Sequence, residues 1–126
     1  MQVPTDDEFD QIVGEALDSL PKKYTRRMQN VAIIYADEPT PEQRRELKLH
    51  CNQTLLGLYQ GVPLPARNGV TPLLPDKITI FKLPLSEMSR DIADLKRRVR
   101  HTLWHEMAHY FGLDHKRIHE LDGTME

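Results

Sequence analysis

The segment HTLWHEMAHYFGLDHKRIHEL (His101–Leu121) constrains the fold of this chain more than any other, because it holds five of the six histidines. Apolar residues recur at helical spacing from Ile92 to Tyr110, and a glycine, Gly112, follows them. Such a stripe predicts a long amphipathic helix with one face in the core. We expect this helix to begin after an N-cap at Ser86 or Ser89 and to end at Gly112, which can adopt a left-handed conformation.

Two of these histidines have the spacing of metal ligands. His105 and His109 are four residues apart, so they lie one turn apart on the same face of the helix. Both imidazoles can then reach one zinc ion at about 2.0–2.1 Å. The turn predicted at Gly112 allows the chain to fold back, and His115, three residues later, can complete a triad. Three protein ligands leave the fourth position of zinc open to water, which is typical of a catalytic site.

Glu106 follows the first of the two histidines and is not expected to bind the metal. Its carboxylate can reach a water at the open position, remove a proton as general base and pass that proton to a leaving amine. Zinc would polarise the substrate carbonyl and lower the pKa of the water to about 7. The pattern therefore predicts a zinc metallopeptidase with a peptide or protein as its substrate.

Several roles around the triad stay open. Asp114 can replace His115 as the third ligand, because a carboxylate oxygen also binds zinc. His119 can be an alternative ligand, a partner of a ligand or a surface residue. As groups that stabilise the oxyanion besides zinc, Tyr59, Arg67 and His119 are unranked candidates.

The rest of the sequence predicts an α+β fold. Capping boxes, β-branched runs and turn residues give this order before the long helix: a helix from Thr5 to Pro21, a strand over Asn30–Asp37, a short helix from Thr40 to near Leu49, a strand over Thr54–Leu64, a loop over 63–75 and a strand over Lys77–Lys82. Gly57 and Gly61 indicate a bulge or a close backbone approach in the second strand. We expect a small, mainly mixed or antiparallel sheet with packed helices, and the active-site helix near the C-terminus.

Length and charge limit the possible functions. At 126 residues and 14.7 kDa, the chain is expected to form a single domain over residues 1–126. Its net charge of −2 argues against a general polyanion binder. A single cysteine, Cys51, excludes an internal disulfide. The N-terminal segment lacks a signal-peptide pattern and no apolar run approaches the roughly 18 residues of a membrane helix, so a cytoplasmic protein without a membrane partner is expected.

Five segments of the chain resemble the small, single-domain zincin-like metallopeptidases known mainly from bacteria. The specific segment is HEMAHYFGLDHKRIHEL, and the supporting segments are DEFDQIVGEALDSLP, NVAIIYADEPTPEQ, LLGLYQGVPLPAR and LPDKITIFKLPL. The resemblance implies a compact α+β zincin core with His105 and His109 as zinc ligands and Glu106 as the catalytic carboxylate. Members of the family often carry an acidic residue near the third-ligand position, whereas here His115 follows Asp114, so both residues remain candidates.

Two other functions are alternatives to the peptidase. The histidine segment alone is also similar to bacterial endoribonucleases of rRNA maturation, and the basic cluster Lys96–Arg100 is the feature that points toward RNA. Those nucleases typically have glycine where this chain has Glu106, so the glutamate favours a peptidase and no nucleic-acid partner is expected. In the second alternative the protein binds zinc and a peptide without turnover, and Thr54–Gly61 pairs with the extended peptide.

Overall fold

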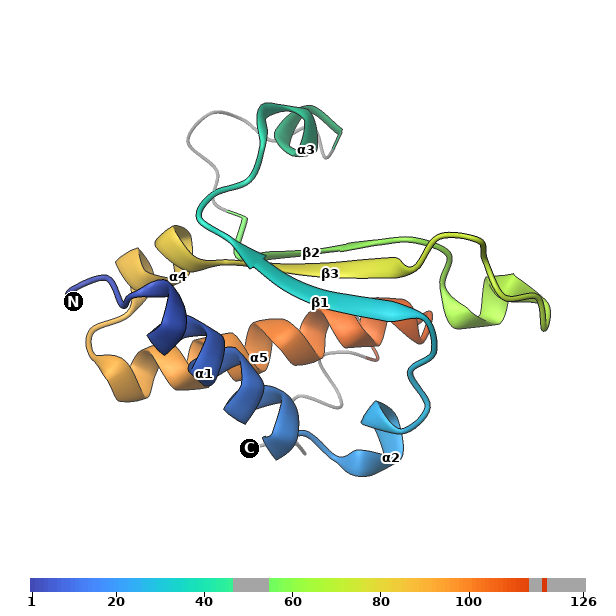
Figure 1. Cartoon of the computed structure of the whole chain (residues 1–126), viewed down its shortest axis with the longest axis horizontal. Helices are drawn as coiled ribbons and strands as arrows, with labels where there is room; N and C mark the ends of the chain where they lie inside the picture. Colours follow the sequence, from blue (N-terminus) through green and yellow to red (C-terminus); the bar gives the residue numbers. More distant parts are fainter. Residues whose placement is uncertain (47–54, 114–116, 118–126) are drawn as a thin grey trace.

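Three strands form one small mixed sheet, with α-helices packed along one of its faces (Figure 1). The computed structural model describes residues 1–46, 55–113 and 117. In the sheet, β1 (Val31–Ala36) runs parallel to the central strand β3 (Asp76–Phe81), and β2 (Gly57–Gln60) runs antiparallel to β3 on its other side. The predicted mixed sheet is therefore confirmed, and β2 is an edge strand among the described residues.

The helices of the described residues confirm the predicted α+β class. They are α1 (Asp6–Ser19), α2 (Lys22–Thr25), α3 (Pro41–Glu46), α4 (Lys82–Met88) and α5 (Ile92–Tyr110), together with the 3-10 helix η1 (Leu64–Arg67). Helices α1 and α5 lie side by side on one face of the sheet, whereas α3 lies on the opposite side (Figure 1). Because α5 contacts β2 as well as β3, its side chains reach the edge strand. None of the described helices is long and apolar enough to cross a membrane.

The core lies between the sheet and the two long helices. Ile78 and Ile80 of β3 point to the same face of the sheet, and both are fully buried. Phe9 of α1 and Leu103 and Met107 of α5 are buried in the same cluster. Each side chain of this kind contributes about 1.5–3 kcal/mol on burial. The predicted apolar stripe of the last helix therefore packs in the core, and another face of α5 is left to line a cleft.

Two helices begin at the predicted capping boxes. The N–H of Glu8 donates to Thr5 Oγ1 at 3.2 Å, and the N–H of Thr5 donates to Glu8 Oε1 at 3.0 Å. The same exchange joins Thr40 and Gln43, at 3.1 and 2.9 Å, where α3 begins. The end predicted for that helix near Leu49 lies outside the described residues.

The predicted start of the long helix at Ser86 or Ser89 is wrong. Ser86 lies within α4 and Ser89 directly follows it, and each hydroxyl donates to the carbonyl oxygen four residues earlier at 2.7 Å. The N-cap of α5 is Asp91, whose carboxylate accepts the N–H of Asp94 at 2.8 Å. Because both serines bond back into the preceding helix, the next side chain with an acceptor oxygen starts α5.

Two strand boundaries also differ from the prediction. The sequence predicts a strand over Thr54–Leu64, whereas β2 ends at Gln60 and a 3-10 helix begins at Leu64. The sequence also predicts Lys82 as the last residue of the following strand, whereas Lys82 begins α4. Its buried ammonium group lies 2.7 Å from the carboxylate of Asp6. Because Asp6 is far from Lys82 in the sequence, the spacing of apolar residues around Lys82 does not predict this contact.

Candidate metal centre

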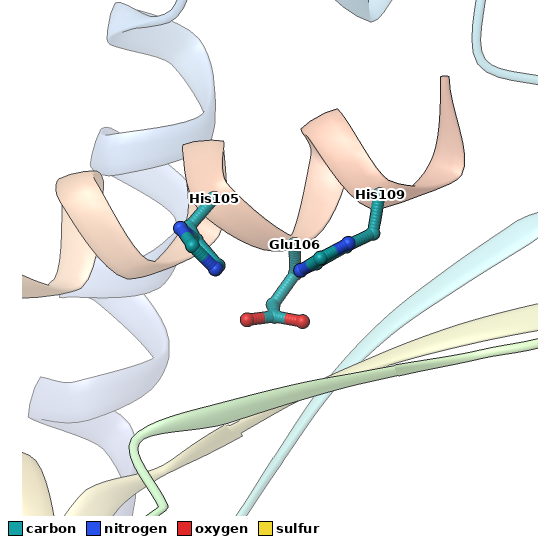
Figure 2. A group of neighbouring side chains, drawn as sticks. All are labelled: His105, Glu106 and His109. Carbon is teal, nitrogen blue, oxygen red and sulfur yellow. The ribbon is translucent and has the colours of Figure 1, made fainter. Parts of the chain in front are cut away.

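Helix α5 carries His105, Glu106 and His109 on the side that faces the strands (Figure 2). One ligand atom from each of the three side chains lies within 4.8 Å of those from the other two. The centroids of the two imidazole rings are 4.9 Å apart, and the ring planes are inclined by 77°. The spacing of four residues therefore brings both rings to one place, with the carboxylate beside them.

A glycine allows the edge strand to lie close to this group. A Cβ atom at Gly57 would lie 2.6 Å from Thr102 Cγ2 and 3.3 Å from Glu106 Cγ, and the first of these distances is too short for two carbon atoms. The close backbone approach predicted for Gly57 is thus confirmed. A larger residue at this position would separate β2 from α5 and change the space around Glu106.

The three side chains open into a cleft of about 380 Å³ between α5 and β2. The rest of its lining is mainly apolar and comes from the strand and the loop around it: Leu55, Gly57, Leu58, Tyr59 and Pro63. Both histidines are half-buried, and Glu106 is buried. The polar groups of the site therefore line a mainly apolar cleft, an arrangement typical of ligand sites.

Burial raises the pKa of Glu106 to about 7, although a hydrogen bond from the backbone of Tyr59 acts in the opposite direction. Burial has this effect because the charged form of a carboxyl group loses its hydration in the protein interior. A carboxyl group with a pKa near neutrality can both accept and release a proton at physiological pH. Its burial thus makes Glu106 a candidate for proton transfer.

The chain turns directly after the second histidine, as predicted. Gly112 has φ +78°, its N–H donates to the carbonyl of His109 at 3.0 Å, and the N–H of Leu113 donates to the carbonyl of Ala108 at 3.0 Å. These two bonds form the Schellman motif of a helix C-terminus. A Cβ at Gly112 would also lie 2.9 Å from Pro65 Cγ. The position therefore needs glycine both for its backbone conformation and for the space that Pro65 leaves.

The predicted third ligand lies beyond this turn. His115 and its alternative Asp114 are outside the described residues, as is His119. The role of each therefore stays a prediction.

The donor set on α5 fits a zinc ion. Two ligands of a tetrahedral zinc, each at about 2.0–2.1 Å, lie roughly 3.3 Å from one another. The ligand atoms of His105 and His109 lie within 4.8 Å, so small rotations of the rings bring them to this separation. Imidazole nitrogens are also the usual zinc ligands of catalytic sites. The two histidines can therefore hold the ion, with Glu106 next to it.

Two of the candidates for oxyanion stabilisation, Tyr59 and Arg67, form hydrogen bonds with another residue, Asp76. The hydroxyl of Tyr59 donates to the carboxylate of Asp76, and Arg67 Nη2 donates to the same carboxylate at 2.7 Å. Both Arg67 and Asp76 are buried. Asp76 was not among the residues predicted from the sequence. Gly61 is the sequence feature that indicates it, because a Cβ at Gly61 would overlap the Asp76 carboxyl group. Tyr59 and Arg67 therefore use their polar atoms to hold Asp76.

The basic cluster Lys96–Arg100 is paired within the helical layer. Arg97 and Arg98 donate hydrogen bonds to Asp94. The ammonium group of Lys96 lies 3.8 Å from the carboxylate of Glu15, and Arg100 donates to Ser19 Oγ at 2.9 Å. No residue of the cluster is among the described residues that line the cleft. These contacts favour a solvated helix face over a surface for RNA.

Comparisons with known proteins agree with this fold. The sequence model of a family described as zincin-like metallopeptidase matches residues 28–124. Among solved structures, a conserved hypothetical protein from T. thermophilus is similar, with 21% identical residues and a TM-score of 0.57 over 95% of this chain and 99% of that chain. At this identity the likeness shows a shared fold. No curated protein matches the chain.

The family match carries the assignment. It spans most of the chain and includes both histidines and the glutamate of the candidate site. A zincin-like fold implies a bound metal, usually zinc, and the group on α5 can hold one. The chain therefore belongs to the family of zincin-like metallopeptidases.

Proposed function

We propose that this protein is a zinc-dependent peptidase that hydrolyses peptide bonds, with His105, His109 and His115 as ligands and Glu106 as general base. The observation that carries the proposal is the convergence of two imidazoles and one buried carboxylate in a cleft beside an edge strand. When bound, zinc supplies Lewis-acid chemistry, because it polarises a carbonyl oxygen and makes water more acidic. The side chains of the protein carry out the other steps of the reaction.

Glu106 moves the proton in this reaction. Its carboxylate lies beside the two imidazoles, where it can take a proton from the attacking water and deliver that proton to the leaving amine. The backbone of Tyr59 bonds to the carboxylate and limits its rotation. The low exposure of Glu106, 8%, keeps bulk water from competing for the same carboxylate.

The edge strand supports binding of an extended peptide. The N–H of Phe81 donates to the carbonyl of Leu56 at 3.0 Å, which fixes the phase of the antiparallel ladder between β2 and β3. By alternation, Leu58 bonds to β3, whereas Gly57 and Tyr59 direct their backbone groups away from it. Because the N–H of Tyr59 donates to Glu106, a substrate would pair with the other outward groups, those of Gly57 and the carbonyl of Tyr59, and run along the cleft beside Glu106. Extended, unfolded segments are therefore the substrate class that we propose.

The experiment compares wild type with Glu106→Gln for zinc content and for cleavage of a peptide library. We expect one zinc per chain in both proteins and cleavage by wild type alone, because glutamine keeps the shape of the side chain but cannot accept the proton. Equal cleavage rates in the two proteins would remove Glu106 from its role. Metal-dependent cutting of structured rRNA fragments would instead support the nuclease alternative.

A non-catalytic peptide-binding module has the same edge strand and the same ligands. The same measurements distinguish it from the peptidase. Such a module binds one zinc and an extended peptide, but neither the wild type nor Glu106→Gln cleaves the peptide. The buried carboxylate of Glu106 favours the enzyme, since a module that only binds has no use for a base beside the metal.

A further inference from the structure

A buried network lies next to the cleft, and Asp76 is at its centre. Its carboxylate accepts the hydroxyl of Tyr59, the backbone N–H of Val62 at 3.2 Å and the guanidinium of Arg67 at 2.7 Å. The residue is 1% exposed, and the absence of a side chain at Gly61 gives it room. One carboxylate thus fixes the chain on both sides of the turn that follows β2.

Arg67 extends the network to α5. Its guanidinium donates to the carbonyl oxygens of Val62 at 3.0 Å and Gln29 at 2.9 Å, and lies 5.0 Å from the ring centre of Tyr110. Tyr110 directly follows His109, and its hydroxyl accepts the N–H of Gln29 at 2.8 Å. A buried charge with several charge-assisted bonds holds its neighbours in one geometry. The same network therefore reaches the end of the helix that carries the candidate ligands.

At its other end the network reaches Glu106. The N–H of Tyr59 points away from β3 in the ladder and donates to the Glu106 carboxylate. The side chain of this same Tyr59 is tied to Asp76. Tyr59 thus contacts the Asp76 carboxylate through its hydroxyl and the Glu106 carboxylate through its backbone N–H.

We propose that Asp76 is a positioning residue for Glu106 and that it acts through Tyr59. It fixes the tyrosine ring at its hydroxyl end, the ring fixes the backbone of the edge strand, and the backbone N–H orients the carboxylate of Glu106. The inference rests on the proposed function, because it concerns the general base of that reaction. Arg67 serves the same purpose indirectly, since it holds the carboxylate of Asp76 in place.

The test removes only the hydroxyl, with Tyr59→Phe in the zinc-loaded protein. The first measurement is the hydrogen-exchange rate of the residue-59 amide by NMR, which does not depend on catalysis. The second is kcat and KM on a peptide that wild type cleaves. We expect the exchange rate to rise and kcat to fall, each about fivefold, as the loss of one ordinary hydrogen bond produces. KM and zinc content should not change.

Two further variants complete the design. Glu106→Ala removes the acceptor and should raise the same exchange rate at least as much as Tyr59→Phe does. Tyr35→Phe is the matched control, because its hydroxyl donates to the backbone of Asp6 at 3.2 Å in a part of the fold that does not line the cleft. It should leave the residue-59 exchange rate and kcat at their wild-type values.

The outcomes separate this inference from the proposed function. An unchanged exchange rate at residue 59, an unchanged kcat in Tyr59→Phe, or an equal fall of kcat in Tyr35→Phe each overturns the positioning role of Asp76. Absence of peptide cleavage by wild type overturns the proposed function instead. In that case the exchange rates alone still decide whether Asp76 positions the carboxylate of Glu106.

Discussion

His105 and His109 hold their imidazole rings 4.9 Å apart, at 77° to one another, on the face of α5 that borders the edge strand. This relation follows directly from the four-residue spacing on a regular helix. If both rings bind one metal ion, the loss of either should weaken its binding, which the first prediction tests.

The first prediction is that His109→Ala loses zinc. Removing a direct ligand should weaken zinc binding by more than about 100-fold, the upper range for losing a group that only supports a ligand. Competition with a chromogenic chelator measures the affinity. His101→Ala is the control, since His101 is exposed and lies two helical turns from His109. Retention of one tightly held zinc per chain in His109→Ala would contradict the assignment.

The second prediction concerns the third ligand. His115→Ala should weaken zinc binding as strongly as His109→Ala, whereas Asp114→Ala should change it by less than about tenfold, the lower range for a supporting group. Zinc affinities of the two variants, measured with the same chelator, provide the comparison. The reverse order would make Asp114 the ligand and would give the site two imidazoles and one carboxylate, a set that zinc enzymes also use.

Features that depend on contacts between residues close together in the sequence could be predicted from the sequence alone. The capping box of Thr5 and Glu8 and the left-handed turn at Gly112 each involve contacts within a few positions, so residue types and spacing predict them. The relation of His105 to His109 is of the same kind. These local rules were enough to locate the candidate site on its helix.

Features that depend on distant contacts were not predictable in this way. Asp76 reads as an ordinary turn residue in the sequence, and its burial follows only from the fold that brings Tyr59 and Arg67 around it. The start of α5 was also misplaced, because two serines bond back into α4 and Asp91 caps the helix instead. In both cases a polar side chain forms a hydrogen bond that the spacing of apolar residues in the sequence does not predict.

The third prediction is that Gly57→Ala damages both stability and activity. The new methyl group would meet Thr102 Cγ2 at 2.6 Å, and overpacking of this kind costs about 1–3 kcal/mol of unfolding free energy. If β2 moves away from α5 to relieve the clash, the backbone donor to Glu106 moves with it. Chemical denaturation and peptide cleavage measure the two effects.

A second substitution shows whether this clash is the cause. Thr102→Ser removes the methyl group that the new side chain would meet, so the double variant should recover most of the stability lost in Gly57→Ala. Gly14→Ala is the matched control, because a Cβ atom at Gly14 in α1 would have no neighbour within 4 Å among the described residues, and alanine there should stabilise the helix by up to about 1 kcal/mol. Equal destabilisation by both single substitutions would contradict the close approach of β2 to α5.

The fourth prediction concerns stability against pH. The backbone N–H of Arg90, followed by Arg98 and Arg97, lowers the pKa of Asp94 from 3.8 to about 2. Since the folded state holds this carboxyl group ionised more strongly than the unfolded state does, Asp94 stabilises the fold fully above about pH 4, and this stabilisation is lost as the pH falls toward 2. Urea denaturation of wild type and Asp94→Asn should therefore give a difference in unfolding free energy that is constant near neutrality and shrinks between pH 4 and pH 2. A difference that stays constant down to pH 2 would mean that the side chain stabilises α5 through its shape and not through its charge.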